Sequence, residues 1–156
     1  MDTTDLKKGY QTNAKRISAL CGGVSQETAT TRPMDKINSL VWEVGHLTFV
    51  RNTVIKLLNP TEKLEVTENE KELFGNGSKP ADAAQYPSLE SVVELLNKRG
   101  DRIYELLDNT TQNYLNSESP IKIPHLGDTP GQLIYTFMIH EANHYGEMNI
   151  IKKLAV

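Results

Sequence analysis

Three of the four histidines in this chain of 156 residues are placed to share one chemical task. His140 and His144 are four positions apart in a stretch with helical periodicity, so their side chains lie on one face, one turn apart. Two neutral imidazoles at that spacing can point at one divalent metal ion, at about 2.0–2.1 Å each. Without an ion they would be two adjacent bases in a poorly solvated place, which is unfavourable. His46, in the middle of an earlier apolar stretch, supplies a third candidate ligand.

Three protein ligands leave coordination positions open for water or substrate, which is typical of a catalytic metal site. The ion would lower the pKa of a bound water or thiol and so generate a nucleophile near neutral pH. An all-histidine ligand set favours one divalent ion of zinc or nickel, and it also suits iron or copper. The alternative interpretation of a single histidine such as His46 is a core residue with a hydrogen-bond partner. The pair with helical spacing favours the metal.

Three further residues flank the candidate ligands. Trp42 precedes His46 by one helical turn and could wall a pocket, although a large apolar side chain is more often part of a core. Asn143 and Tyr145 flank His144, so either could bind substrate or orient an imidazole through a hydrogen bond. A surface asparagine and a packing tyrosine are equally good interpretations.

The segment from His140 to His144 also matches the H-E-x-x-H pattern of zinc peptidases, in which Glu141 would be the general base. The metzincin continuation is missing, because Gly146 stands one position early and no third histidine follows. Glu141 lies about 100° around the helix from His140, so we expect it at the surface or supporting a ligand. A zinc hydrolase is therefore the weaker alternative.

Amphipathic periodicity predicts the helices that would carry these residues, with approximate bounds 6–21, 34–58, 88–116 and 129–154. We expect connections at 24–33, 59–87 and 117–128, with a short helical turn at 68–73. Thr129 and Gln132 form a capping box that marks the start of the last helix.

The long connection at 59–87 suits a crossover that lets the second and third helices run parallel. The pattern therefore predicts an all-α fold, a four-helix bundle in up-down-down-up order with the second helix facing the fourth. Residues 1–156 are expected to form a single domain.

Composition restricts the partners and the compartment. A net charge of −3 argues against nucleic-acid binding, which needs clustered basic residues. The single cysteine, Cys21, excludes an internal disulfide and favours a reducing compartment. The first residues are polar and acidic, unlike a secretory signal, and no apolar run approaches the ~20 residues that span a bilayer. We expect a soluble cytoplasmic protein that binds neither nucleic acid nor membrane.

Three segments of the chain together resemble the DinB/YfiT-like family: 42–47 (WEVGHL), 74–80 (FGNGSKP) and 140–147 (HEANHYGE). The resemblance extends from Leu6 to Leu154. It implies a four-helix bundle, commonly dimeric, with a metal held by His46, His140 and His144. Where the family often has glutamine, this chain has Glu147, which either adds a charge near the site or is a neutral surface variation.

Several members of that family use a low-molecular-weight thiol, as S-transferases or thiol-dependent isomerases, while many have no assigned activity. The resemblance therefore implies a divalent-metal-dependent enzyme, a thiol-dependent S-transferase acting on a small electrophilic molecule, and a homodimer. Nothing in it implies DNA binding. The alternative is a non-catalytic metal-binding protein, or a dimeric structural or stress-response protein.

Overall fold

The computed structural model describes residues 2–67 and 69–155. Its elements are α1 (Thr3–Cys21), α2 (Gln26–Thr30), α3 (Leu40–Leu58), α4 (Glu70–Phe74), η1 (Ala83–Gln85, a 3-10 helix), α5 (Leu89–Asp108), α6 (Gln112–Leu115) and α7 (Pro130–Leu154). In these residues, pairing of the strand type is limited to one isolated bridge between Ile123 and Gly127. The predicted all-α class is therefore confirmed. Both ends of the predicted domain 1–156, and Glu68 in the predicted turn at 68–73, lie outside the described residues.

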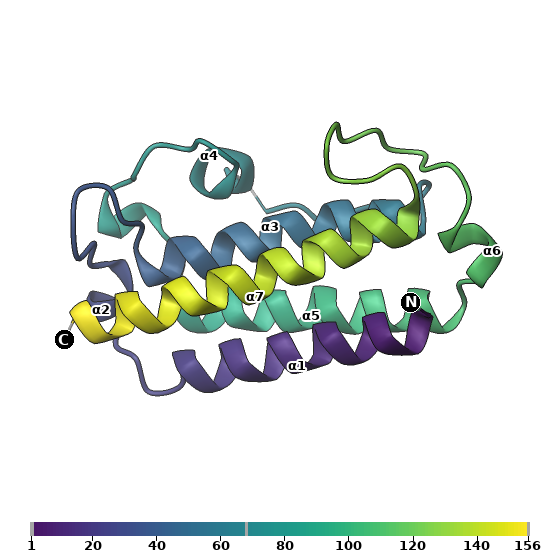
Figure 1. Cartoon of the computed structure of the whole chain (residues 1–156). Helices are drawn as coiled ribbons and strands as arrows, with labels where there is room; N and C mark the ends of the chain where they lie inside the picture. The colour runs from purple at the N-terminus through teal and green to yellow at the C-terminus, as the bar shows by residue number, and fades with distance from the viewer. Residues whose placement is uncertain (1, 68, 156) are drawn as a thin grey trace.

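Four long helices of the described chain lie side by side (Figure 1). α3 packs against α5 and α7, and α1 packs against the same two helices. The crossover segment between α3 and α5 returns along the outside of α3, where α4 covers it. α3 is consequently enclosed on several sides, as its apolar circumference predicts, and it is the element against which the other site-bearing segments are positioned.

None of the helices in the described part of the chain combines the length and the apolar character needed to cross a membrane.

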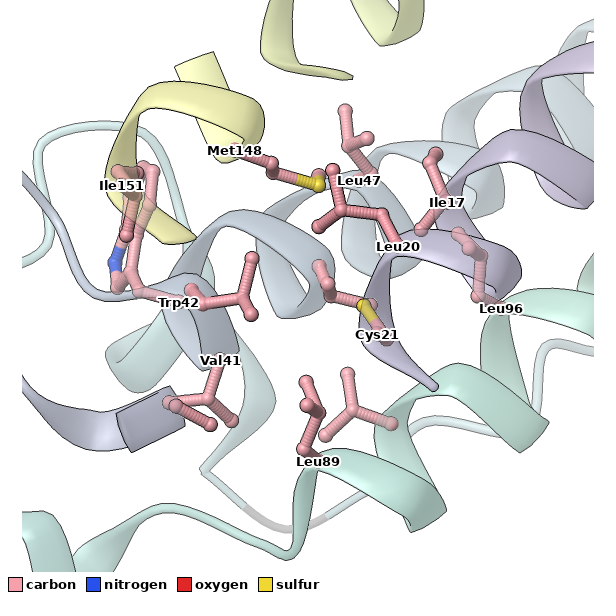
Figure 2. Packing of buried hydrophobic residues seen from close by; sticks show 14 of the residues in the cluster. Ile17, Leu20, Cys21, Val41, Trp42, Leu47, Leu89, Leu96, Met148 and Ile151 are labelled. Atoms are coloured by element: carbon pink, nitrogen blue, oxygen red, sulfur yellow. The ribbon is translucent and has the colours of Figure 1, made fainter. Parts of the chain in front are cut away.

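The hydrophobic interior consists of two clusters along the bundle. The first core cluster contains Ile17, Leu20, Trp42, Leu47, Leu96, Met148, Ile151 and their neighbours. Figure 2 shows side chains from α1, α3, α5 and α7 directed into this cluster. The second core cluster contains Leu6, Tyr10, Val54, Ile103, Leu133 and their neighbours. Both clusters use all four long helices, so each one fixes the position of α7 relative to α3.

The start of α3 differs from the prediction. The helix begins at Leu40, not near residue 34. The Arg32 side chain donates from Nε to the Ile37 carbonyl at 3.1 Å, and the Ile37 amide donates to the Met34 carbonyl at 3.0 Å. These bonds hold residues 34–37 in a turn. The periodicity of Ile37 and Leu40 could not reveal it, because the Arg32 side chain that binds the Ile37 carbonyl lies outside the periodic segment.

The predicted connection at 24–33 contains the short helix α2. Ser25 caps it by accepting a hydrogen bond from the Thr28 amide at 3.1 Å. Its first residue, Gln26, also holds the start of α5: the side chain donates to the Pro87 carbonyl at 3.0 Å and accepts from the Leu89 amide at 2.8 Å. The third predicted helix is likewise divided, since α5 ends at Asp108 and α6 forms separately.

The start of α7 is confirmed as predicted. The Gln132 amide donates to Thr129 Oγ1 at 3.2 Å and the Thr129 amide donates to Gln132 Oε1 at 3.2 Å, completing the capping box. The Tyr10 hydroxyl then donates to the Ile134 carbonyl at 2.9 Å, which ties α7 to α1. The histidine-bearing turns of α7 are thus held from one side while they face α3 on the other.

Candidate metal site

The structure brings the side chains of His46, His140 and His144 together between α3 and α7. One ring nitrogen from each of the three residues lies within 4.8 Å of the other two. The ring centre of His46 is 5.3 Å from that of His140 and 5.1 Å from that of His144. The i, i+4 spacing on α7 and one position on α3 therefore produce a convergent group of three imidazoles, which we call the histidine cluster.

His46 is held in a single orientation by the crossover segment and by its own helix. Its Nδ1 lies 2.8 Å from the Phe74 carbonyl oxygen, which can only accept a hydrogen bond. The proton of the neutral ring is therefore on Nδ1, which leaves the Nε2 lone pair free. The Trp42 ring stacks on His46 with 4.9 Å between centroids and 5° between planes. Burial lowers the pKa of His46, so the ring is neutral near pH 7.

His144 is oriented by acidic side chains. Its Nδ1 is hydrogen bonded to the buried carboxylate of Glu43, one turn before His46 on α3. Glu147, which is exposed, places an oxygen 3.6 Å from the same nitrogen and so adds a charge beside the cluster. Burial alone would lower the pKa of His144, but the hydrogen bond and charge of Glu43, followed by the charge of Glu147, raise it. A carboxylate on Nδ1 again directs Nε2 into the cluster.

His140 completes the group. Its Nε2 is 3.0 Å from His144 Nε2, and its Nδ1 is buried with no hydrogen-bond partner in the described residues. Burial, followed by the neighbouring His144 and His46, lowers the pKa of His140 to about 4. His140 is therefore a neutral ligand donor over the whole physiological range.

The arrangement fits a divalent metal ion. Two nitrogens that bind one ion at about 2.0–2.1 Å lie roughly 2.8–3.4 Å apart for ordinary bond angles. The observed 3.0 Å between His140 Nε2 and His144 Nε2 falls in that range. The nitrogen donors are the kind that zinc, nickel, copper and iron accept, and two of the rings have a hydrogen-bonded Nδ1, as ligating histidines usually do. The three imidazoles could therefore hold one metal ion.

Two residues of this site were missed in the sequence, namely Glu43 and Phe74. Glu43 carried a signal, because a carboxylate three positions before His46 in a mainly apolar stretch needs a polar partner when it is buried. Phe74 acts through its backbone, which leaves no trace in residue type.

The three residues predicted to flank the candidate ligands lie in different environments. Trp42 lies on the cluster, against His46, and its Nε1 also donates to Ser78 Oγ at 2.8 Å. Asn143 is exposed. Tyr145 packs against the first core cluster and lines a groove on the side of α1.

We expected Glu141 at the surface or supporting one of the candidate ligands. This expectation was wrong, because its side chain is buried and binds neither of the neighbouring histidines. It is 1% exposed and forms two hydrogen bonds with Arg51 of α3, from Nε to Oε1 at 2.7 Å and from Nη2 to Oε2 at 3.0 Å. Arg51 also donates to the Leu96 carbonyl at 2.6 Å and lies 5.8 Å from the centre of the Tyr10 ring. The pair therefore connects all four long helices, and the glutamate of the H-E-x-x-H pattern has a structural partner.

Comparisons with known proteins agree with this geometry. Residues 10–148 match the family model described as the DinB superfamily. A crystal structure described as a conserved protein of locus from Enterococcus faecalis is similar over 99% of this chain and 98% of that one, with a TM-score of 0.75 and 16% sequence identity, so it shows the same fold. The comparison with curated proteins gives no match. Because the family model spans most of the chain, including all three histidines, this protein belongs to the DinB superfamily.

Proposed function

We propose that His46, His140 and His144 hold one divalent metal ion through their Nε2 atoms, and that the protein is a metal-dependent enzyme. The observation that carries this proposal is the convergence of three ring nitrogens, two of them on rings that Phe74 and Glu43 orient through Nδ1. His46 and His140 have lowered pKa values and are neutral near pH 7, so neither has to lose a proton before it binds a cation. The third ring, His144, is oriented by the Glu43 carboxylate.

The chemistry that we infer is transfer of a low-molecular-weight thiol to a small electrophilic molecule. A bound zinc or nickel ion would supply a coordinated thiol or water of lowered pKa, a nucleophile near neutral pH. The chain's own residues would keep the ligands in place: Glu43 holds the Nδ1 proton of His144, Phe74 holds that of His46, and the stacked Trp42 ring shields one face of His46 from water.

Elemental analysis of the purified protein tests the metal site. We expect about one equivalent of a divalent transition metal in the wild type and a loss of most of it in His46→Ala, His140→Ala and His144→Ala. His125→Asn is the control, because His125 is the one remaining histidine, is exposed, and has a positive φ of 70° that asparagine tolerates. Full metal retention in the His46 and His144 variants would overturn the assignment.

Consumption of common biological thiols with a panel of small electrophiles tests the transferase activity. We expect turnover that depends on the added metal and disappears in His144→Ala. The absence of turnover with any thiol or metal, in protein that retains its metal, would favour a non-catalytic metal-binding protein. A zinc hydrolase is the least supported alternative, because both carboxylate oxygens of Glu141, the general base of that pattern, bind Arg51 instead.

We also infer that residues 1–156 form one domain with the up-down-down-up order. Two hydrogen bonds support a parallel arrangement of α1 and α7. Tyr10, early in α1, binds Ile134, early in α7, and Leu20, late in α1, binds Lys152, late in α7. For α1 and α5 the order is reversed, since Lys7 pairs with Asp108 and Ser18 with Asn97. The buried, single cysteine supports a reducing, cytoplasmic setting.

A homodimer is the last part of the proposal. Four large apolar side chains lie exposed along the outer face of α7, at Tyr135 (40%), Ile139 (40%), Ile150 (57%) and Leu154 (48%). Exposed apolar side chains gathered along one helix mark a surface that a partner can cover. A second copy of the chain, offering the same stripe across a twofold axis, would cover this face.

A further inference from the structure

A cavity lies beside Phe74, and none of the three histidines lines it. It has a volume of about 360 Å³ and is enclosed by α3, α4, η1 and α5, under the crossover segment. Its walls are mainly apolar, with the rings of Phe74 and Tyr86 5.9 Å apart and the side chains of Val92 and Leu95 opposite. A cavity of this size and polarity is in the range of small-molecule sites.

The charged groups and hydroxyls of this cavity are already paired, which defines the charge of its ligand. Both oxygens of Glu70 bind Arg99, and Oε2 also accepts from the Thr67 amide at 3.2 Å. The Thr48 hydroxyl donates to the Val44 carbonyl at 2.7 Å. No free charge therefore faces a ligand from the described lining, and burying an ionised group there would be unfavourable.

One hydrogen-bond donor is available at the edge. The Gln85 side chain accepts from the Asp82 amide through Oε1 at 3.0 Å, and in the described residues its amide nitrogen has no partner. A ligand with an acceptor oxygen can bind this nitrogen while its apolar part packs against the cavity's apolar wall.

The cavity is also mechanically connected to the histidine cluster. Phe74 contributes its ring to the cavity and its carbonyl oxygen to His46 Nδ1. Gly45, next to His46, lines the cavity as well, and a Cβ there would lie 2.3 Å from the Phe74 ring. A molecule that contacts the Phe74 ring therefore contacts the residue whose carbonyl oxygen orients His46.

We propose that this cavity binds a neutral, mainly apolar molecule of the size of a substituted benzene, carrying one acceptor oxygen. Binding does not require the metal, because none of the cavity's lining residues belongs to the histidine cluster. Occupancy shifts the hydrogen bond between Phe74 and His46, which makes the cavity a second ligand site that adjusts the first.

Saturation-transfer NMR on the full chain, with acetophenone as the probe and a chelator present, tests the site. Acetophenone is expected to bind, ethylbenzene to bind several-fold more weakly without its acceptor, and benzoate at least tenfold more weakly with its charge. The hydrogen-bonded Nδ1 proton of His46 should shift when acetophenone is added. Equal binding of benzoate, or no saturation transfer from any probe, would overturn the proposal.

Two variants locate the binding. Leu95→Trp fills the cavity from α5 and is expected to reduce acetophenone binding at least tenfold. Leu106→Trp, on the same helix, similarly half-buried and against the second core cluster, is the control that keeps wild-type binding. If Leu95→Trp fails to fold, Ser91→Trp at the exposed edge gives the same expected loss. Wild-type binding in a folded Leu95→Trp or Ser91→Trp protein would place acetophenone elsewhere and contradict the assignment, whatever the metal content.

Discussion

Each imidazole of the histidine cluster has a different neighbour at Nδ1, and this difference determines its protonation. His46 has a carbonyl, His144 has a carboxylate, and His140 has no partner among the described residues. The carbonyl at His46 does not offset the effect of burial, and His140 has no group that could, so burial lowers the pKa of both rings. Only the carboxylate of Glu43 outweighs burial, so His144 is the ring of the cluster that takes up a proton first.

The metal-free protein should therefore titrate in a defined order. On lowering the pH, His144 is expected to protonate above 6.5, whereas His140 stays neutral until about pH 4. Because a proton on His144 Nε2 competes with the ion, metal affinity should fall as the pH falls through the raised pKa of His144. NMR titration of the imidazole signals, beside metal binding at each pH, measures both. Protonation of His140 before His144 would contradict the described hydrogen bonds.

Gly45 is a second point at which one residue controls the cluster. Gly45→Ala would place a Cβ 2.3 Å from the Phe74 ring, so the ring and its carbonyl have to move. We expect a loss of about 1–3 kcal/mol in unfolding free energy, typical of overpacking, together with weaker metal binding. Urea denaturation measures the first quantity and metal titration the second.

A double-mutant cycle supplies the control for Gly45→Ala. Phe74→Leu removes most of the ring atoms that the new Cβ would meet. The cost of Gly45→Ala should therefore be smaller in the Phe74→Leu background than in the wild type. An equal cost in both backgrounds would mean that the clash with the ring is not the cause.

At the level of elements, α3 and α7 meet through a polar connection inside an apolar bundle. Arg51 and Glu141 are both almost fully buried, with side-chain exposures of 0% and 2%. Gly100 of α5 provides the room, because a Cβ at that position would lie 2.5 Å from Arg51 Nη1. Since Glu141 lies between His140 and His144 on α7, the pair sets the rotation of α7 that directs both histidines at His46.

Removing one partner of this pair should be costly. Glu141→Ala leaves the Arg51 charge buried without a counter-ion, so the unfolding free energy is expected to fall by about 3–5 kcal/mol. Replacing both partners, in Arg51→Met with Glu141→Leu, should cost less than the single change. Urea denaturation measures the unfolding free energies of the wild type, the single variant and the double variant. The control is Glu65→Ala, because Glu65 pairs with Lys98 at the surface, where the ion pair is screened by water and a much smaller loss is expected. Equal losses for Glu65 and Glu141 would contradict the structural role.

For the whole molecule, the outer face of α7 is the feature that remains uncovered. Its exposed apolar side chains follow the length of the helix that also carries His140 and His144. A partner on this face would therefore stabilise the helix that provides two of the three candidate ligands.

Charge introduced into this face should separate the dimer. We expect the wild type to sediment as a dimer at micromolar concentration and Ile150→Glu to sediment as a monomer, because an unpaired carboxylate would be buried at the interface. Val66→Glu is a matched control: Val66 is as exposed as Ile150, at 57%, but lies in the crossover segment. A monomeric wild type, or an unaffected Ile150→Glu, would contradict the proposed interface.

Much of this protein is encoded locally and could be predicted from the sequence. The helix periodicity, the capping box of Thr129 and Gln132, the spacing of His140 and His144, and the family all follow from neighbours within a few positions or from short motifs. Helices and their caps depend on bonds between residues three or four apart, so residue type and order are sufficient to predict them.

The tertiary structure alone decided what surrounds those residues. Glu141 and Arg51 are 90 positions apart, His144 and Glu43 are 101 apart, and His46 and Phe74 are 28 apart. Periodicity places Glu141 beside the histidine stripe but does not tell whether that flank meets solvent or another helix. Only the packing of α3 against α7 supplies Arg51 for the glutamate, and Glu43 and the Phe74 carbonyl for the imidazoles, because burial requires each of these polar groups to find a partner on a distant segment.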